Sequence, residues 1–181
     1  MPPEPSDPTA LIPAWVDGTL TPVDKLDAHR RGLRHKAVSV FVTEGPRLLI
    51  QQRAAGKYHT PGLWANTCCT HPHWGEAGAA CATRRLREEL GVEGLTLAPR
   101  GTLEYRADVG GGMVEHEVVE VFVAEASATL PLAPDPSEVQ ATEWVALDAL
   151  AARMRHEPER FTPWLRIYLA EHRDDIFGSP R

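Results

Sequence analysis

The segment from Trp64 to His73, WANTCCTHPH, places two cysteine thiols beside two imidazoles. Cys69 lies two residues before His71, and a charged run, RRLREELGV, begins thirteen residues later at Arg84. A thiol can act as a nucleophile or carry a proton, and an imidazole can bind a metal. A helix rich in arginine and glutamate can hold phosphate and metal. So many reactive side chains within about thirty residues indicate an active site.

Residues 77–90 are predicted to form the helix that carries this charged run. Its small and apolar positions recur every three or four residues, and a glycine follows as a stop signal: Ala79, Ala82, Leu86, Leu90 and Gly91. Arg85, Glu88 and Glu89 then share one face, because residues three and four apart are neighbours on a helix. That face could present both charge signs to a ligand.

Strands are predicted on both sides of the cysteine segment. Residues 38–42 and 47–53 favour two strands, joined by the turn sequence TEGP. The alternating, valine-rich residues 114–125 predict another strand. The remaining expected elements are loops at 56–62 and 128–139, a short strand at 143–145 and helices at 147–155 and 163–172. Because strands and helices do not alternate regularly, we expect an α+β fold with a mixed β-sheet sandwiched between helices.

Length and composition favour a single domain. The chain has 181 residues, of which 43% are hydrophobic and 24% charged, as in ordinary globular proteins. Its start is proline-rich, so we predict a flexible segment at 1–14 followed by one domain at 15–175. No apolar run approaches the roughly 20 residues of a membrane span, and the start lacks the basic and apolar regions of a signal peptide. We therefore expect a cytoplasmic protein without a membrane partner.

Charge and cysteine content narrow the function classes further. The net charge of −6 argues against nucleic acid as a partner. Residues 1–110 hold 13 of the 19 lysines and arginines, alongside the motifs, which suits a small anionic ligand. Three cysteines, two of them adjacent, make a poor disulfide framework, so free thiols are expected. The expected assembly state is a monomer or a weak dimer.

The segment from Thr70 to Val92 resembles the Nudix box, which runs Gly, five residues, Glu, seven residues, Arg-Glu, an aliphatic, any residue, Glu-Glu, any residue, Gly and an aliphatic. The matching positions are Glu76, Arg84, Leu86, Glu88, Glu89, Gly91 and Val92. Thr70 replaces the first glycine, and Arg85 replaces the glutamate after the arginine. In Nudix hydrolases these carboxylates gather metals that activate water. Arg85 binds phosphate rather than metal, so the resemblance implies a site that holds a diphosphate without readily hydrolysing it.

Six further stretches occur in a fixed order along the chain: Asp27–His35, Gln51–Trp64, Asn66–Pro72, Glu104–Arg106, Glu115–Glu117 and Thr162–Trp164. With them the chain, over roughly residues 15–170, resembles the type 1 isopentenyl-diphosphate isomerases, which belong to the Nudix superfamily and are not hydrolases. The resemblance implies interconversion of isopentenyl and dimethylallyl diphosphate through a tertiary carbocation. That reaction needs an acid, a base on the opposite face and a dry pocket that tolerates a cation.

The resemblance assigns these needs to four residues. Cys69 matches the thiol that exchanges a proton at one end of the allylic unit, and Glu117 matches the glutamate on the opposite face. Tyr105 would form a hydrogen bond with Glu117 and help it protonate the alkene. Trp164 matches the tryptophan whose ring stabilises the cation, a contact that can reach about 2 kcal/mol or more when desolvated. Cys68 is predicted to be a small core residue.

Five side chains match the metal site of that family: His29, His35, His71, Glu115 and Glu117. Imidazoles and carboxylates together suit Mn²⁺, Mg²⁺ or Zn²⁺. Glu115 and Glu117 are two residues apart on a predicted strand and so point to one face, whereas His116 points away. The other histidines are expected to be ordinary surface or core residues: His59, His73, His156 and His172.

A diphosphate clamp is implied by four cations: Lys25, Arg53, Lys57 and Arg85. The same resemblance implies a second ion, Mg²⁺ held by Glu89 against the diphosphate. The expected partner is therefore a small molecule, isopentenyl diphosphate.

Two alternatives remain open from the residues alone. The first is a Nudix pyrophosphohydrolase acting on another diphosphate, which Arg85 disfavours and which leaves the cysteine and histidine set unexplained. The second is a non-enzymatic zinc module that uses the cluster Cys68, Cys69, His71 and His73. Adjacent cysteines do not give the CxxC spacing that is usual in structural zinc sites.

Overall fold

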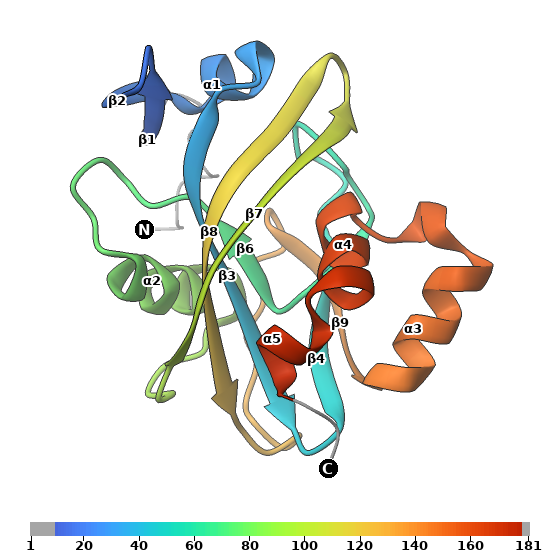
Figure 1. Cartoon of the computed structure of the whole chain (residues 1–181). Coiled ribbons are helices and arrows are strands. Elements are labelled where there is room, and N and C mark those ends of the chain that lie inside the picture. Colours follow the sequence, from blue (N-terminus) through green and yellow to red (C-terminus); the bar gives the residue numbers. More distant parts are fainter. Residues whose placement is uncertain (1–9, 179–181) are drawn as a thin grey trace.

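The computed structural model describes residues 10–178, which form a mixed nine-stranded sheet with helices packed on both faces (Figure 1). The strands are β1 (Leu11–Val16), β2 (Thr19–Asp24), β3 (Arg34–Glu44), β4 (Arg47–Arg53), β5 (Trp64–Ala65), β6 (Cys68–Thr70), β7 (Ala98–Gly110), β8 (Met113–Glu125) and β9 (Val139–Ala146). The helices are α1 (Lys25–Arg31), α2 (Gly78–Leu90), α3 (Leu147–His156), the 3₁₀ turn η1 (Pro158–Arg160), α4 (Pro163–Glu171) and α5 (Arg173–Phe177). This arrangement confirms the predicted α+β class with a mixed sheet between helices. No helix within the described range is long and apolar enough to cross a membrane.

Strand β3 is the centre of the sheet. Its residues 37–43 are all buried, as expected for a strand that is covered on both faces. It pairs in parallel with β8 and antiparallel with β1, β4 and β6. Its neighbour β6 carries the two cysteines, and its neighbour β8 carries the paired glutamates. The cysteines and the glutamates therefore lie on two strands that both pair with β3.

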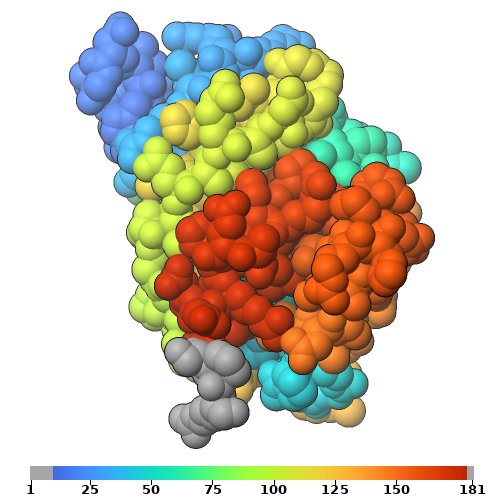
Figure 2. Space-filling view, turned by 45° about the vertical axis from the view of Figure 1, so that its right-hand side comes forward, coloured from blue at the N-terminus to red at the C-terminus, as the bar shows by residue number. Residues whose placement is uncertain are grey.

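The alternation of side chains separates two hydrophobic cores. Val38 of β3 packs with Cys68 against the buried side of α2. Phe41 faces the other way and packs with α4 and α5, in the core that Cys69 also touches. Figure 2 shows α4 and α5, coloured red, packed beside β7 over that face of the molecule. The pleat of β6 therefore sends its two adjacent thiols to opposite faces of the sheet.

Helix α1 is short, and its two ends define it. The Asp24 side chain accepts a hydrogen bond of 2.8 Å from the backbone N–H of Asp27, which caps the start. Gly32, with φ of 61°, ends the helix in the left-handed conformation. The buried side of the helix carries Ala28 and His29 and packs on β8. These caps fix the direction in which His29 approaches the glutamates.

Most predicted elements are confirmed, including the hairpin, the helix at 77–90, the strand at 114–125 and the helices at 147–155 and 163–172. The strand predicted at 143–145 is longer, because β9 spans Val139–Ala146. β1, β2 and β7 were not predicted from the sequence, since the first two contain prolines and the third is mostly exposed. The flexible segment predicted at 1–14 is too long, because β1 begins at Leu11; its first nine residues lie outside the described range.

Gly91 offers a test of how α2 is held in place. It ends the helix with φ of +65°, and a Cβ there would lie 2.8 Å from the Ala133 Cβ. We expect Gly91→Ala to lower the free energy of unfolding by about 1–2 kcal/mol from backbone strain alone, with the clash adding to it. Urea denaturation measures the change.

The matched control is Gly94→Ala. Gly94 has φ of +76°, but nothing lies within 4 Å of its added Cβ. The control should therefore show the backbone strain without the clash. Equal losses of stability in the two variants would contradict the contact with Ala133.

Candidate active site

One cavity on the α4 side of the sheet collects most of the residues predicted to act. Its lining includes ten of them: Lys25, Arg53, Lys57, Cys69, His71, Arg85, Glu89, Glu115, Glu117 and Trp164. The three others, Tyr105, His29 and His35, lie behind this lining and contact its glutamates. The structure thus brings together side chains from seven separate stretches of the sequence.

Cys69 reaches the cavity from β6, whereas Cys68 is fully buried in the core beside α2. The Cys69 Sγ lies 2.8 Å from the Ser39 Oγ, which in turn lies 2.9 Å from the Tyr168 hydroxyl. Burial, with the nearby Glu117 and Glu115 charges, raises the pKa of the Cys69 thiol well above its ordinary value. The sulfur therefore holds its proton at rest. Ser39 and Tyr168 were not predicted, because both occupy positions that look like ordinary core residues.

Glu115 and Glu117 lie on the same face of β8 and are nearly fully buried. Tyr105 pairs with Glu117 across the β7–β8 ladder, and its hydroxyl lies 2.7 Å from the Glu115 Oε2 and 2.8 Å from the Glu117 Oε2, so it can donate its one proton to either carboxylate. Burial and the two carboxylate charges raise the pKa of Tyr105 well above its ordinary value. Tyr105 therefore keeps its proton and acts as a hydrogen-bond donor. His116 points away and contacts Glu104 at 3.2 Å.

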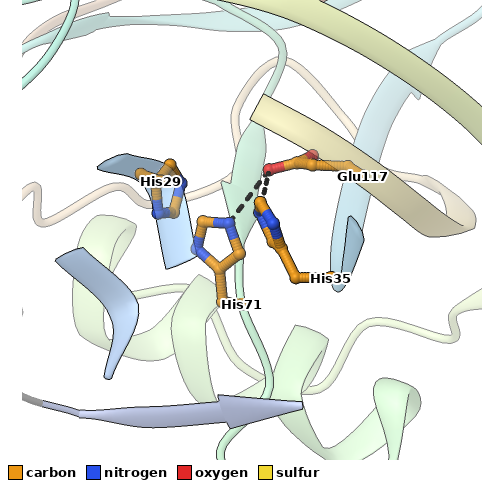
Figure 3. Close-up of side chains that lie close together, drawn as sticks. All are labelled: His29, His35, His71 and Glu117. Atoms are coloured by element: carbon orange, nitrogen blue, oxygen red, sulfur yellow. Dashed lines mark hydrogen bonds and ion pairs between the residues drawn. The ribbon is translucent and has the colours of Figure 1, made fainter. Parts of the chain in front are cut away.

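Three histidines converge on these carboxylates. The Nε2 atoms of His71 and His35 lie 2.9 Å and 3.6 Å from the Glu117 Oε1. Figure 3 shows these two contacts as dashed lines, with His29 beside them. The His29 Nε2 lies 3.9 Å from the Glu115 Oε1. Burial, together with neighbouring His35, lowers the pKa of His29 to about 4. Burial, together with the Lys25 charge, lowers that of His71 well below its ordinary value. Both imidazoles are thus neutral near pH 7, the form that binds a metal.

The donor set fits a divalent metal ion. Backbone carbonyls of Lys25 and Leu33 lie 2.6 Å and 2.7 Å from Nδ1 of His29 and His35, which leaves each Nε2 facing the carboxylates. These two Nε2 atoms are buried and have no hydrogen-bond partner among residues 10–178. Such outer contacts typically fix the tautomer of a metal-binding histidine. Ligand atoms of His29, His35, His71 and Glu117 all lie within 4.8 Å of one another, so they could hold an ion.

His59 also lines this cavity, although no motif or spacing in the sequence indicates that it would. Its side chain is buried, its Nε2 is 3.2 Å from the Glu115 Oε1, and its ligand atom lies within 4.8 Å of those of His29 and Glu115. His59 is buried with polar partners, as expected of a core histidine, and one of those partners is the candidate metal ligand Glu115. His59 belongs to a loop, where side-chain direction follows no periodic pattern. By contrast, His73 and His156 are exposed.

The four predicted clamp cations face the same cavity, where buried carboxylates contact two of them. Arg85 donates to Glu88 at 2.9 Å and to Glu89 at 2.6 Å, and its Nη2 lies 3.4 Å from the Glu138 Oε2. The Lys57 Nζ also contacts Glu138, at 2.5 Å. Burial, with the charges of Lys57 and Arg85, lowers the pKa of Lys25 to about 8. Glu138 was not predicted, since it follows a proline-rich loop with no motif.

Trp164 closes the cavity from α4. It is almost fully buried, and the Arg53 guanidinium carbon lies 5.3 Å from its ring centroid. The ring face that meets this guanidinium already accepts a positive charge. Trp164 therefore places an aromatic ring that accepts positive charge in the wall of the cavity.

The placement of the thiols removes one alternative. A zinc module would need Cys68 and Cys69 to reach one ion, but their side chains belong to opposite faces of the sheet. Neither of the two clusters in the described residues that could hold a metal contains a cysteine. The zinc module built on this cysteine pair is therefore contradicted.

The fold and the glutamate-bearing helix define a Nudix protein. The sequence-family model of the NUDIX domain matches residues 33–165 of this chain. A crystal structure of DR0079 from Deinococcus radiodurans shares the fold, with a TM-score of 0.71 and 18% identity over 88% of this chain and 96% of that one. A MutT NUDIX hydrolase from Burkholderia pseudomallei gives a TM-score of 0.59 and 24% identity, covering 77% of this chain and 98% of that one.

Sequence comparison identifies the branch. The isopentenyl-diphosphate Delta-isomerase of Cereibacter sphaeroides is 67% identical, covering 94% of this chain and 97% of the relative. The enzyme of the same name from Dinoroseobacter shibae is 66% identical, covering 93% and 96%. This chain belongs to the isopentenyl-diphosphate Delta-isomerase family of the Nudix superfamily.

Proposed function

We propose that this chain interconverts isopentenyl diphosphate and dimethylallyl diphosphate. The observation that carries the proposal is that a thiol, Cys69, and a carboxylate, Glu117, line one cavity together with four cations. The names of the relatives, which share about two thirds of their residues with this chain, support the same activity. The cations suit the diphosphate, and the thiol and the carboxylate suit the two proton transfers.

The reaction forms one C–H bond at the terminal alkene carbon and breaks another at the carbon two bonds away, so no net proton is consumed. We assign the exchange at one end to the Cys69 thiol and the exchange at the other to the Glu117 carboxyl group, which Tyr105 holds in place. Because the reaction is reversible, each group donates a proton in one direction and accepts it in the other. Trp164 stabilises the tertiary cation between the two steps.

The metal site would be made by His29, His35 and His71 with Glu115 and Glu117. A bound Mn²⁺, Mg²⁺ or Zn²⁺ supplies positive charge that polarises the carboxylates. A second ion, Mg²⁺, would bind at Glu89 and neutralise the diphosphate. The Glu89 carboxylate accepts hydrogen bonds from Gln51 and Arg85, at 2.8 Å and 2.6 Å. A small diphosphate is the partner that these charges favour, and a cytoplasmic location remains a prediction.

Arg85 favours an isomerase over a hydrolase. It stands where the Nudix box has a metal-binding glutamate, and its buried guanidinium faces the cavity. A cation in that place attracts the diphosphate but removes a ligand from the metal that would activate water. The second candidate, a pyrophosphohydrolase, is thereby disfavoured.

The direct test is product analysis with the purified protein, isopentenyl diphosphate and Mg²⁺. We expect dimethylallyl diphosphate to appear without release of phosphate. A panel of nucleoside diphosphates and triphosphates, assayed for phosphate release, is the parallel test. Phosphate release from nucleotides without any allylic product would overturn the proposal.

Replacing Arg85 with methionine should weaken both the fold and the clamp. The side chain lies between Glu89 and Glu138, both at most 5% exposed, and removing it leaves these charges without their shared guanidinium. We expect the free energy of unfolding to fall by about 3–5 kcal/mol. Binding of inorganic pyrophosphate should weaken as well. Urea denaturation and titration calorimetry measure the two effects.

Arg87→Met is the matched control, because Arg87 lies on the same helix with a side chain that is 59% exposed. Its effect should stay within about 0.5 kcal/mol. If Arg85→Met were as stable as this control, Arg85 would not be holding the buried carboxylates together.

A further inference from the structure

His59 occupies a position that joins the metal site to the loop that follows β4. The loop runs from residue 54 to residue 63 and also carries the clamp residue Lys57. The His59 side chain is buried, and its Nε2 lies 3.2 Å from the Glu115 Oε1. Its backbone carbonyl accepts a hydrogen bond of 3.2 Å from Arg53. Neither the fold nor the two proton transfers explains why an imidazole should stand there.

The His59 ring is held in the same way as two of the predicted metal ligands. Its Nδ1 lies 2.9 Å from the Thr60 Oγ1, just as Nδ1 of His29 and His35 lies against a backbone carbonyl. A backbone carbonyl beside Nδ1 can only accept, so it holds the proton on that nitrogen, and the Thr60 hydroxyl does the same for His59 when it accepts from Nδ1. The Nε2 lone pair then points inward. The three rings are tilted against one another, but each Nε2 faces a carboxylate of β8.

A bare Nε2 and a carboxylate oxygen repel each other unless a proton or a cation lies between them. For His59 the neighbouring oxygen belongs to Glu115, which also faces the His29 Nε2 at 3.9 Å. The ligand atoms of these three residues all lie within 4.8 Å of one another, which is the span that one bound ion can bridge. The arrangement therefore has the geometry of a ligand group.

We propose that His59 is a fourth imidazole ligand of the metal centre and binds the ion through Nε2, beside His29 and Glu115. The inference rests on the metal centre of the proposed function and extends it to a residue outside the matched set. It ties the ion to the diphosphate clamp, because the same loop carries Lys57 and contacts Arg53. Binding of the ion then orders the clamp, and binding of a diphosphate strengthens binding of the ion by the same factor.

The test counts imidazole ligands in the full-length protein loaded with Co²⁺. Each bound histidine gives one strongly shifted, solvent-exchangeable N–H signal in the proton NMR spectrum. We expect four such signals in the wild-type protein and three in His59→Gln. Titration with Mn²⁺ should show affinity falling by about 10-fold or more in that variant. If the variant does not fold, the wild-type count alone decides between four ligands and three.

His116→Gln is the matched control, since His116 lies between the two glutamates in sequence but points to the other face. It should keep four signals and the wild-type affinity for Mn²⁺. Three signals in the wild-type protein, as expected if His59 only donates a hydrogen bond to Glu115, would overturn this inference and leave the metal centre standing. A wild-type protein that binds no Co²⁺ would overturn both.

Discussion

Cys69→Ala is expected to lower the turnover of isopentenyl diphosphate by about 10²–10⁴-fold. The substitution removes the only thiol that lines the cavity within residues 10–178 and leaves one end of the allylic unit without a proton exchanger. The Michaelis constant should change little, because the clamp cations that hold the diphosphate are untouched. Turnover measured at saturating substrate and Mg²⁺, with binding of inorganic pyrophosphate as a separate readout, distinguishes loss of chemistry from loss of binding.

Cys68→Ala is the natural control, since it removes a neighbouring thiol from the opposite face of β6. We expect it to keep most of the activity and to lose a little stability, because it leaves a small space beside α2. Comparable rates for the two variants would refute the assignment of the proton exchange to Cys69.

Glu117→Gln should lower turnover by a similar factor. The amide keeps the size of the side chain but can neither give nor take the proton, and it removes a negative charge that faces His35 and His71. It should therefore also weaken metal binding. Assays at saturating Mn²⁺, with the metal content of the same sample measured by atomic absorption, separate the chemical loss from the loss of the ion.

Glu120→Gln provides the comparison on the same strand. Glu120 lies three residues further along β8 and faces Gly78 of α2 instead of the cavity. This variant should turn over at close to the wild-type rate. If Glu117→Gln, fully loaded with metal, were as active as Glu120→Gln, the carboxyl group of Glu117 would have no part in the proton transfers.

The parts of the fold that could be predicted are those with a clear pattern. The helix at 77–90 has apolar spacing and a glycine stop, and the strand at 114–125 alternates, so both were placed correctly. β7 escaped prediction because most of its side chains face solvent and its residues lack an apolar face. Periodic spacing of apolar residues reveals a strand only when one of its faces is buried. β7 is held mainly by its hydrogen bonds to β8, so its sequence shows little apolar periodicity.

The residues of the candidate site also divide into those that a sequence pattern places and those that it does not. Alternation on a strand was enough to put Glu115 and Glu117 on one face and His116 on the other. Of the residues that were missed, Ser39 and Tyr168 look like ordinary core residues, whereas His59 and Glu138 lie in loops whose direction depends on contacts distant in sequence. Neither composition nor spacing could show that both side chains turn inward to meet residues from other elements.

The pleat of β6 has a consequence for how this sequence can change. Because successive side chains of a strand alternate, inserting one residue just before Cys68 would move Cys68 into the place of Cys69 and turn Cys69 to the opposite face. The reactive position would pass to the other member of the pair, and the former proton carrier would be sealed against α2. The proton exchange assigned to Cys69 therefore depends on its pairing with Ser39 across β3 and β6. A length change before Cys68 should be tolerated only where the preceding loop absorbs it and Cys69 stays opposite Ser39.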